Sequence, residues 1–579
     1  MKRLYSTVQS IILLGVLLIS NAHLFAQDDN FGHSLPREMT AEEQLRVGEI
    51  GKSFVETLPP TGTIRNIAEF EQMEGALIRY PFGIPYSLIA EMSQNCVVWT
   101  VVTNVSQKNT VITSYTSNGV NLANCKWIYA PSDSYWTRDY GPWFVHYGNH
   151  ELGIVDFPYN RPRPNDDEIP KVVADTMNIN WFGMNLIHTG GNYMTTGAGM
   201  SSSTDLTAVE NPTLTQTQIE QKALDYLGVT TYSLVADPNG TYIDHIDCWG
   251  KYLAPDKVLV RSVPSTHAQY SLIEQTAAFY ANQISPYGTP YKVFRVNTPG
   301  NQPYSNSVIL NNKVLMAFMG NQALDTAAQH AYELAMPGYT VTGYIGLGGG
   351  NGWQSTDALH CRVMGMADRG MLEIVHMPYS GHQPVLSQYP VNADIFAYTH
   401  AGLYPDSVKM SYSINGGSYT SIIMTHLGGT SYTANIPGQA LGTVVRYYIH
   451  AADSAGRSAN HPIMGGIDPH MFDIGTTSVD PIQGFDPQTA TLDNAWPNPF
   501  NTQTTIGFTI RTAGKVRLEI IDIQGRVVDV LKDESLGIGH YQVNWGGFNA
   551  SGERMSPGVY FSRFRSGNKV WTKKLVLLP

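Results

Sequence analysis

Short apolar runs alternate with helix-like stretches through the first two thirds of the chain. The run CVVWTVV at 96–102 is followed by a polar stretch, a turn at Asn118-Gly119 and the apolar run CKWIYA at 125–130. Apolar runs of this length that end at turn residues are typical of buried strands, and the polar stretch between them is typical of a surface helix. The pattern therefore predicts a β-α-β unit.

The same alternation of strand-like and helix-like stretches recurs along the chain. Further helix-like stretches lie between strand-like runs at 215–226, 267–284 and 324–336. The repetition predicts an α/β domain built from similar modules over residues 63–403. The glycine run at 348–350 lacks the lysine of a phosphate loop, and no GxGxxG motif is present, so a nucleotide site is not indicated.

The helix-like stretches stop at about Tyr404. Alternating strands separated by Gly, Ser and Asn turns follow at 408–413, 432–436 and 443–451. The run VRYYIHAADSAGR is similar to the late strands of immunoglobulin-like modules, so we expect a small β-sandwich over residues 404–474. A polar linker is expected at 475–490, and a last β-rich domain at 491–579.

The N-terminus has the order of a secretory signal peptide. Lys2 and Arg3 precede the apolar run at 11–19, and small residues follow up to Ala26. The apolar run is shorter than the roughly 20 residues that span a bilayer. Residues 1–26 are therefore predicted to be a signal peptide, which directs export.

An acidic segment that ends near Pro60 follows the signal and is expected to form an N-terminal leader over residues 27–62. Thr40 with Glu43 three positions later predicts a capping box that opens a short helix. Two interpretations of this segment stay open: a leader that is trimmed away, or a cover on the main domain.

Composition and charge narrow the class of protein. The chain has 579 residues, is 42% hydrophobic and carries a formal net charge of -11, so several folded domains are expected and nucleic acid is not an expected partner. Only four cysteines occur. Cys96 and Cys125 each open a strand-like run, and whether they are bridged stays open. No CxxC pair or His/Cys spacing indicates a zinc site.

The candidate chemistry begins with Cys361, which lies in the segment DALHC after the glycine-rich turn. A cysteine attacks only as a thiolate, and a single buried cysteine is more often a core residue, so its companions decide. Asp139 lies in WTRDYGPW, and His245 and Asp247 lie in YIDHIDCW. If YIDHIDCW is a strand, His245 and Asp247 point to the same face, although an isolated HxD is more often a polar pair.

The combination is more specific than its parts. WxRDxGP, then HxD, then GGG…HC, in this order within repeated α/β modules, resembles the guanidino-group modifying enzymes. These enzymes include the agmatine, arginine and peptidylarginine deiminases. The resemblance is to the bacterial peptidylarginine deiminases above all, because the interval between Gly350 and Cys361 is longer than in agmatine deiminases. It implies a five-bladed α/β propeller, the pentein fold, with the substrate arginine on the central axis.

The resemblance also implies a role for each candidate residue. Asp139 and Asp247 hold the substrate guanidinium, whose five donors suit carboxylates. Cys361 attacks the central carbon and forms a covalent thiouronium. His245 acts first as general acid and then as base. Asn306 helps to orient the site, and the scheme requires neither a metal nor an organic cofactor.

Specificity is expected to depend on the segment NRPRP, which contains Arg161 and Arg163. By itself this pair reads as a solvated loop. In the enzymes that the chain resembles, such a pair binds the carboxylate of a C-terminal arginine, which implies peptides or proteins ending in arginine as partners. Trp136, Tyr242 and Ile243 are expected to flank the substrate side chain.

Two other functions stay open: a deiminase of free arginine or agmatine, and a surface adhesin that has lost its activity. The end of the chain, with WPNPF at 496–500 and a closing basic-apolar tail, resembles the C-terminal sorting domain of type nine secretion. That resemblance implies the outer-membrane secretion machinery as a partner, followed by release or attachment at the cell surface.

Overall fold

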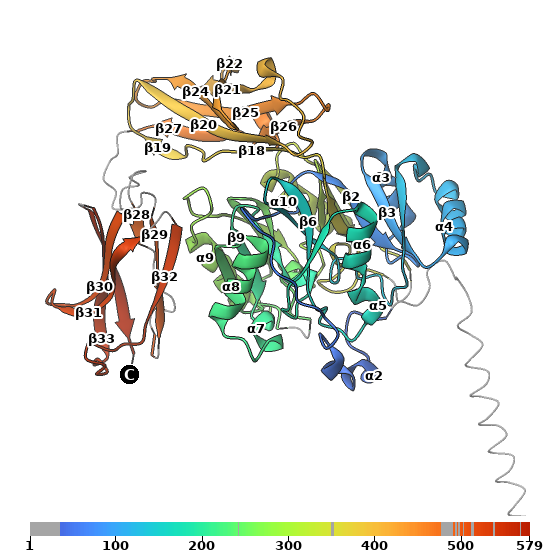
Figure 1. The fold of residues 1–579 in the computed structure, drawn as a ribbon, viewed down its shortest axis with the longest axis horizontal. Helices are drawn as coiled ribbons and strands as arrows, with labels where there is room; N and C mark the ends of the chain where they lie inside the picture. Colours follow the sequence, from blue (N-terminus) through green and yellow to red (C-terminus); the bar gives the residue numbers. More distant parts are fainter. Residues whose placement is uncertain are drawn as a thin grey trace, which may run out of the picture. The chain divides into compact units, whose positions relative to one another are not determined.

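The computed structural model describes residues 35–240, 243–348, 352–475 and 490–578, the last range with gaps at 493–494, 496–497, 499, 502, 511–513, 537–538 and 568. The chain divides into two compact units, Met1–Thr476 and Thr477–Pro579 (Figure 1). The signal peptide expected at 1–26 and nearly all of the linker expected at 475–490 lie outside the described residues.

The α/β part of the first unit contains, among the described residues, five small sheets. In strand order they are β17(Met364–Ala367)-β2(Met73–Arg79)-β3(Val97–Val102)-β4(Cys125–Tyr129); β1(Arg65–Asn66)-β5(Trp143–Tyr147)-β6(Glu151–Asp156)-β7(Asn180–Gly183); β8(Met194–Thr195)-β9(Met200–Thr204)-β10(Thr231–Val235); β11(Gly250–Ala254)-β12(Lys257–Ser262)-β13(Lys292–Asn297); and β14(Val308–Leu310)-β15(Lys313–Phe318)-β16(Thr340–Ile345). The last strand, β17, pairs with the early strand β2, so the two ends of this part of the chain meet in one sheet.

Each sheet repeats one pattern, which confirms the predicted modules. An antiparallel pair is followed by a helical crossover to a parallel strand, as in β11-β12-β13 and β14-β15-β16. The helices are α2(Ala41–Gln44), α3(Tyr86–Asn95), α4(Val105–Ser117), α5(Pro164–Asp167), α6(Ile169–Met177), α7(Leu206–Glu210), α8(Gln216–Leu227), α9(Tyr270–Asn282) and α10(Gln322–Ala335). No helix among the described residues is long and apolar enough to cross a bilayer.

Local sequence signals account for several of these boundaries. α8 begins at a capping box, in which the Thr215 hydroxyl accepts from the backbone N–H of Gln218. It ends at Gly228, whose φ of +66° suits glycine. The predicted β-α-β unit at 96–130 is present as β3, α4 and the parallel strand β4. β3 is almost wholly buried, as its continuous apolar run predicts.

Two further sheets form a sandwich at the end of the first unit. One sheet is β18(Leu372–Val375)-β20(Gln388–Ala397)-β24(Ser431–Pro437)-β23(Thr425–Gly428), and the other is β19(Gly381–Gln383)-β27(His470–Ile474)-β25(Val444–Ala452)-β21(Lys409–Ile414)-β22(Thr420–Ile423), with β26(Ser458–His461) on β25. Their facing side chains share one core. The sandwich therefore begins at about Leu372, and the expected boundary at 403 is wrong, because β18 pairs with β20 and β20 with β24, and neither pairs with the α/β sheets.

The second unit is β-rich, as expected. Its sheets are β28(Ala490–Leu492)-β29(Thr504–Ile510)-β32(Gly539–Trp545) and β31(Val527–Leu536)-β30(Gly514–Asp522)-β33(Gly558–Ser566)-β34(Lys569–Leu577). They enclose a core that includes Phe508, Trp545 and Phe564.

Candidate active site

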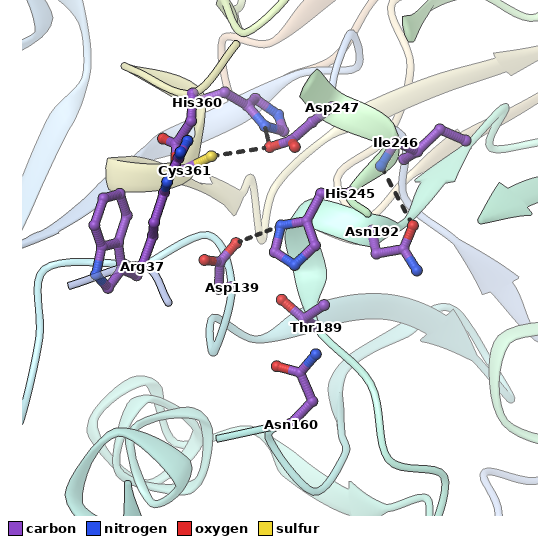
Figure 2. Close-up of polar contacts among 12 residues, drawn as sticks. Arg37, Asp139, Asn160, Thr189, Asn192, His245, Ile246, Asp247, His360 and Cys361 are labelled. Carbon is purple, nitrogen blue, oxygen red and sulfur yellow. Dashed lines mark hydrogen bonds and ion pairs between the residues drawn. The ribbon is translucent and has the colours of Figure 1, made fainter. Parts of the chain in front are cut away.

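Cys361 lies at the centre of a buried polar cluster formed by residues that are far apart in the sequence (Figure 2). It sits in the 3-10 turn His360–Arg362, directly before β17, and its side chain is almost wholly buried. Its Sγ is 3.3 Å from Asp247 Oδ2 and 3.3 Å from Asn306 Nδ2. Asn306 also holds the turn in place, because its Oδ1 accepts the backbone N–H of Ala358 and of His360.

Asp139 and His245 form the opposite side of this cluster. Asp139 lies in the tight turn after β4, and its backbone carbonyl accepts from the N–H of Gly190 at 2.8 Å. Its carboxylate Oδ1 is 3.7 Å from His245 Nδ1. Both side chains are buried. The structure thus brings the predicted residues Asp139, His245, Asp247, Asn306 and Cys361 into one cluster.

The local geometry around His245 differs from the expected strand. Asp244 has a positive φ of 56°, and Ile246–Cys248 is a 3-10 turn. Strand alternation is therefore the wrong reason for the shared direction of His245 and Asp247. Asn192 supports the turn instead, since its Oδ1 accepts the backbone N–H of Ile246 (Figure 2).

Gly191 marks the point on which these groups converge, and sequence reasoning missed it. A Cβ atom at this position would lie 2.5 Å from Asp139 Oδ1 and 2.7 Å from His245 Nδ1. It would also lie 3.2 Å from Asp247 Oδ2. Contacts this short are not tolerated, so glycine allows the backbone to pack directly against the polar cluster.

Each of the five modules contributes one loop to this cluster. Asp139 precedes β5, Gly191 precedes β8, Asp247 precedes β11, Asn306 precedes β14 and Cys361 precedes β17. In every case the loop follows the last parallel strand of one module and leads into the next sheet. Equivalent positions in the repeated modules thus meet at one place.

Several polar atoms of the cluster are buried without a hydrogen-bond partner in the described part of the chain. They are Asp139 Oδ1, Asp247 Oδ1 and both ring nitrogens of His245. Folded proteins rarely leave such atoms unpaired, so their concentration here indicates a place for a ligand. Two carboxylate oxygens that each lack a donor suit a cation with several N–H groups, and a guanidinium has five in one plane.

Burial and neighbouring negative charges disfavour the thiolate form of Cys361. Burial, followed by the negative charges of Asp247 and Asp357, raises the pKa of Cys361 well above its usual range. Burial and the same two carboxylates raise the pKa of Asp139. A cation bound between the carboxylates would oppose both effects, because it favours the thiolate and the ionised acid.

The pKa values of His245 and Asp247 are both lowered, but for different reasons. Burial lowers the pKa of His245 to about 3, although Asp247 opposes this shift. Burial would raise the pKa of Asp247, but the hydrogen bond and charge of His360 outweigh it and the pKa is lowered. The cluster therefore combines a neutral imidazole with an ionised carboxylate, the pair that acid-base catalysis requires.

His360 links the cluster to a second buried charge network that sequence reasoning also missed. Its Nδ1 is 2.7 Å from Asp247 Oδ2, and its Nε2 is 2.8 Å from Glu69 Oε2. Both ring nitrogens therefore face a carboxylate oxygen. Glu69 in turn pairs with Lys251 at 2.8 Å. The only signal in the sequence is that His360 precedes the candidate nucleophile.

The structure describes four of the five residues predicted to bind the rest of the substrate. Arg161 and Arg163 are buried rather than in a solvated loop, and the charge of Arg161 lowers the pKa of His245. Ile243 is buried and lines a small cavity with Cys248. Tyr242 lies outside the described residues.

Trp136 is buried, and its ring already has a partner from the chain itself. The guanidinium carbon of Arg362 lies 5.2 Å from the centre of the Trp136 ring and 5.1 Å from that of Tyr135. The four cysteines are free thiols, so no bridge joins Cys96 to Cys125.

Comparison with known proteins agrees with this chemistry. A protein of Mycoplasma mycoides, provisionally named agmatine deiminase, is 25% identical over 307 residues, which cover 44% of this chain and 82% of the relative. A Yersinia pestis protein with the same provisional name is 26% identical over 287 residues, or 41% and 76% of the two chains. The solved agmatine deiminase of Enterococcus faecalis has 16% identity and a TM-score of 0.45, and the match covers 53% of this chain and 96% of that one.

Two family models match the chain. Residues 494–578 match the secretion system C-terminal sorting domain, which indicates export and attachment at the cell surface. The model of the Porphyromonas-type peptidyl-arginine deiminases matches residues 65–361, which is just over half of the chain and includes the whole polar cluster. The chain therefore belongs to the Porphyromonas-type peptidyl-arginine deiminase family and is a deiminase that acts on the C–N bonds of amidines.

Proposed function

We propose that this enzyme converts the arginine of peptides to citrulline and releases ammonia, with a preference for C-terminal arginine. The observation that carries the proposal is the pair of unpartnered carboxylate oxygens on Asp139 and Asp247, beside a buried thiol and a neutral imidazole. A guanidinium supplies donors for both carboxylates, and its flat face is left open to the sulfur.

The first half of the reaction forms a bond between sulfur and carbon. The bound cation lowers the pKa of Cys361, and His245 takes the thiol proton. The thiolate attacks the central guanidinium carbon. His245 then gives the proton to one terminal nitrogen, the C–N bond breaks and ammonia leaves.

The second half hydrolyses the thiouronium. A water molecule attacks the same carbon while His245 accepts its proton, and the C–S bond breaks. The sulfur leaves as the thiolate and takes back a proton from the hydroxyl group of the product, which leaves the neutral ureido group of citrulline. His245 passes the water proton to solvent. One water is consumed and one ammonia is released in each cycle.

Arg161 and Arg163 support the preference for a C-terminal arginine. Both are buried, their charges lower the pKa of Asp139 against the effect of its burial, and paired guanidinium groups are suited to a carboxylate. Agmatine has no carboxylate for them to bind. The second candidate, a deiminase of agmatine or free arginine, is supported by the provisional names of the curated relatives.

The finer architecture is also part of the proposal. Five modules that each contribute one loop to a common point support a five-bladed α/β propeller with the substrate on its axis. The two sheets with a shared core support an immunoglobulin-like module, here taken to begin at about residue 372.

A substrate panel tests the proposal. The purified chain is incubated separately with a peptide ending in arginine, a peptide with internal arginine, free arginine and agmatine, and the ureido product and ammonia are measured. We expect the highest kcat/KM for the peptide ending in arginine. A higher value for agmatine would instead support the second candidate.

Cys361→Ala is expected to abolish turnover of every substrate in the panel, because it removes the sulfur that lies 3.3 Å from Asp247 Oδ2. Cys125→Ala, which removes a thiol distant from the cluster, is the matched control and should keep full activity. Turnover by Cys361→Ala would refute the nucleophile.

A further inference from the structure

Residues 35–44 lie over the side chains that are proposed to bind substrate. The backbone carbonyls of residues 35, 36 and 37 accept hydrogen bonds from Trp136 Nε1, Arg163 Nη2 and Arg161 Nε at 2.9, 2.7 and 3.3 Å respectively. One short stretch of the leader thus forms hydrogen bonds with three residues from two different loops. Of the two interpretations of this segment, its structure favours a cover.

Glu43 completes this contact with a carboxylate. Its two oxygens lie 2.6 Å from Arg163 Nε and 3.2 Å from Arg163 Nη2, and neither side chain is exposed to solvent by more than 6%. The predicted capping box is present, because the Thr40 hydroxyl accepts the N–H of Glu43 and Glu43 accepts that of Thr40. The box holds the Glu43 carboxylate in the position that Arg163 binds.

Arg37 supplies the opposite charge at the other end of the contact. Its Nη1 lies 3.6 Å from Asp357 Oδ2 and donates to the backbone carbonyl of Ser355 at 3.2 Å. The side chain extends toward the segment that carries Cys361 (Figure 2). Arg37 does not occupy the cluster itself, since Asp139 Oδ1 and Asp247 Oδ1 have no partner among the described residues.

We propose that the face formed by Trp136, Arg161, Arg163 and Asp357 is a peptide-docking surface, and that residues 35–44 are its resident ligand. The segment presents a guanidinium and a carboxylate, the two charged groups of a C-terminal arginine. A substrate peptide has to displace the segment before its own carboxylate reaches Arg163. This inference rests on the proposed function and adds a built-in competitor to it.

Glu43→Gln in the full chain tests the competition. Gln still satisfies the capping box, but it removes the charge that pairs with Arg163. If the docked form holds about nine tenths of the molecules, release lowers the apparent KM for a peptide ending in arginine about tenfold, because the open fraction sets the apparent affinity. Glu42→Gln, on the exposed face of the same turn, is the matched control and should leave KM unchanged.

An increase in activity cannot come from misfolding, so a lower KM in Glu43→Gln, and separately in Arg37→Gln, would support the proposal. A KM equal to that of Glu42→Gln in both variants would overturn it. Absence of turnover on every guanidine by the unaltered chain would instead refute the proposed function.

A binding measurement checks displacement without turnover. In full-length Cys361→Ala, a saturating peptide that ends in arginine should make the backbone amides of residues 35–44 exchange hydrogen faster. A bound peptide that leaves their exchange unchanged would also overturn the proposal, whereas the proposed function would stand.

Discussion

Burial and the charges of neighbouring groups shift the pKa values of the central residues of this enzyme. Burial and neighbouring carboxylates raise the pKa values of Cys361 and Asp139, and burial lowers the pKa of His245 to about 3. A guanidinium cation bound between the carboxylates would oppose the effects on Cys361 and Asp139, because its charge favours the thiolate and the ionised acid. Substrate binding and activation of the nucleophile are therefore the same event.

At this scale His360 is a positioning residue, since it acts on the reacting groups through Asp247. Its hydrogen bond and charge lower the pKa of Asp247. In His360→Gln we expect the pKa of Asp247 to rise, so that on falling pH the ionised form is lost earlier. The acid limb of the kcat/KM profile should move to higher pH.

The same variant should lower kcat/KM at neutral pH at least tenfold, because a charge-assisted hydrogen bond contributes about 1.5–3 kcal/mol. His330→Gln, on an exposed helix face, serves as the control. An unchanged pH profile with a reduced kcat would mean that His360 acts through packing alone.

At the scale of elements, the loops that follow the last strand of each module carry the chemistry. The sheets fix the two ends of each loop, and the loops differ in the residue that each one contributes to the polar cluster. The 3-10 turn Gly190–Asn192 brings backbone, at Gly191, close to the cluster, whereas each of the other four described loops brings a side chain.

Gly191→Ala is expected to abolish most activity, because the new methyl group would overlap Asp139 Oδ1 and His245 Nδ1. Overpacking of a buried site costs about 1–3 kcal/mol, so the protein should still fold and the loss should appear chiefly in kcat. Gly48→Ala, where a methyl group meets open space, is the control. Full activity in Gly191→Ala would show that the cluster has room which the structure does not indicate.

Elements with local signals were predicted well from the sequence. Periodicity and capping depend on neighbouring residues in the sequence. They predicted the helix–strand alternation at 96–130, the cap at Thr40, and the β-rich sandwich and second unit. The boundary at 403 was wrong because β18 and β20 read like the apolar runs before them. Only strand pairing, a long-range property, assigns them to the sandwich.

The sequence motifs predicted the central residues of the site but not the buried charged residues that pair with them. Asp139, His245, Asp247, Asn306 and Cys361 are close together, although Ile246–Cys248, within the expected strand, is a 3-10 turn. Glu69 lies 291 positions from His360, and Glu43 lies 120 positions from Arg163. No pattern along the chain indicates such pairs, because only the folded modules bring them into contact.

At the scale of the whole molecule, ion pairs join the sandwich to the α/β part within the first unit. Asp368, which is buried, accepts from Arg457 Nη2 at 2.8 Å, and Arg65 Nε lies 2.9 Å from Glu373 Oε1. Such pairs link β18 and β26 to the α/β modules, so the sandwich contributes to the stability of the part of the chain that carries the site.

Arg457→Ala is expected to lower the free energy of unfolding of the first unit by about 1–2 kcal/mol, since it leaves the Asp368 carboxylate buried without this cation. The partial exposure of Arg457 limits the effect. Denaturant unfolding measures it, with Arg46→Ala, which breaks an exposed pair with Glu49, as the control. Equal stability of the two variants would show that the pair at Asp368 contributes nothing.

The most direct measurement is a crystal structure of full-length Cys361→Ala with a peptide that ends in arginine. We expect the guanidinium to lie between the carboxylates of Asp139 and Asp247, with its central carbon facing residue 361. The peptide carboxylate should bind Arg161 and Arg163. A peptide bound elsewhere, or an arginine side chain that leaves either carboxylate unpaired, would contradict it.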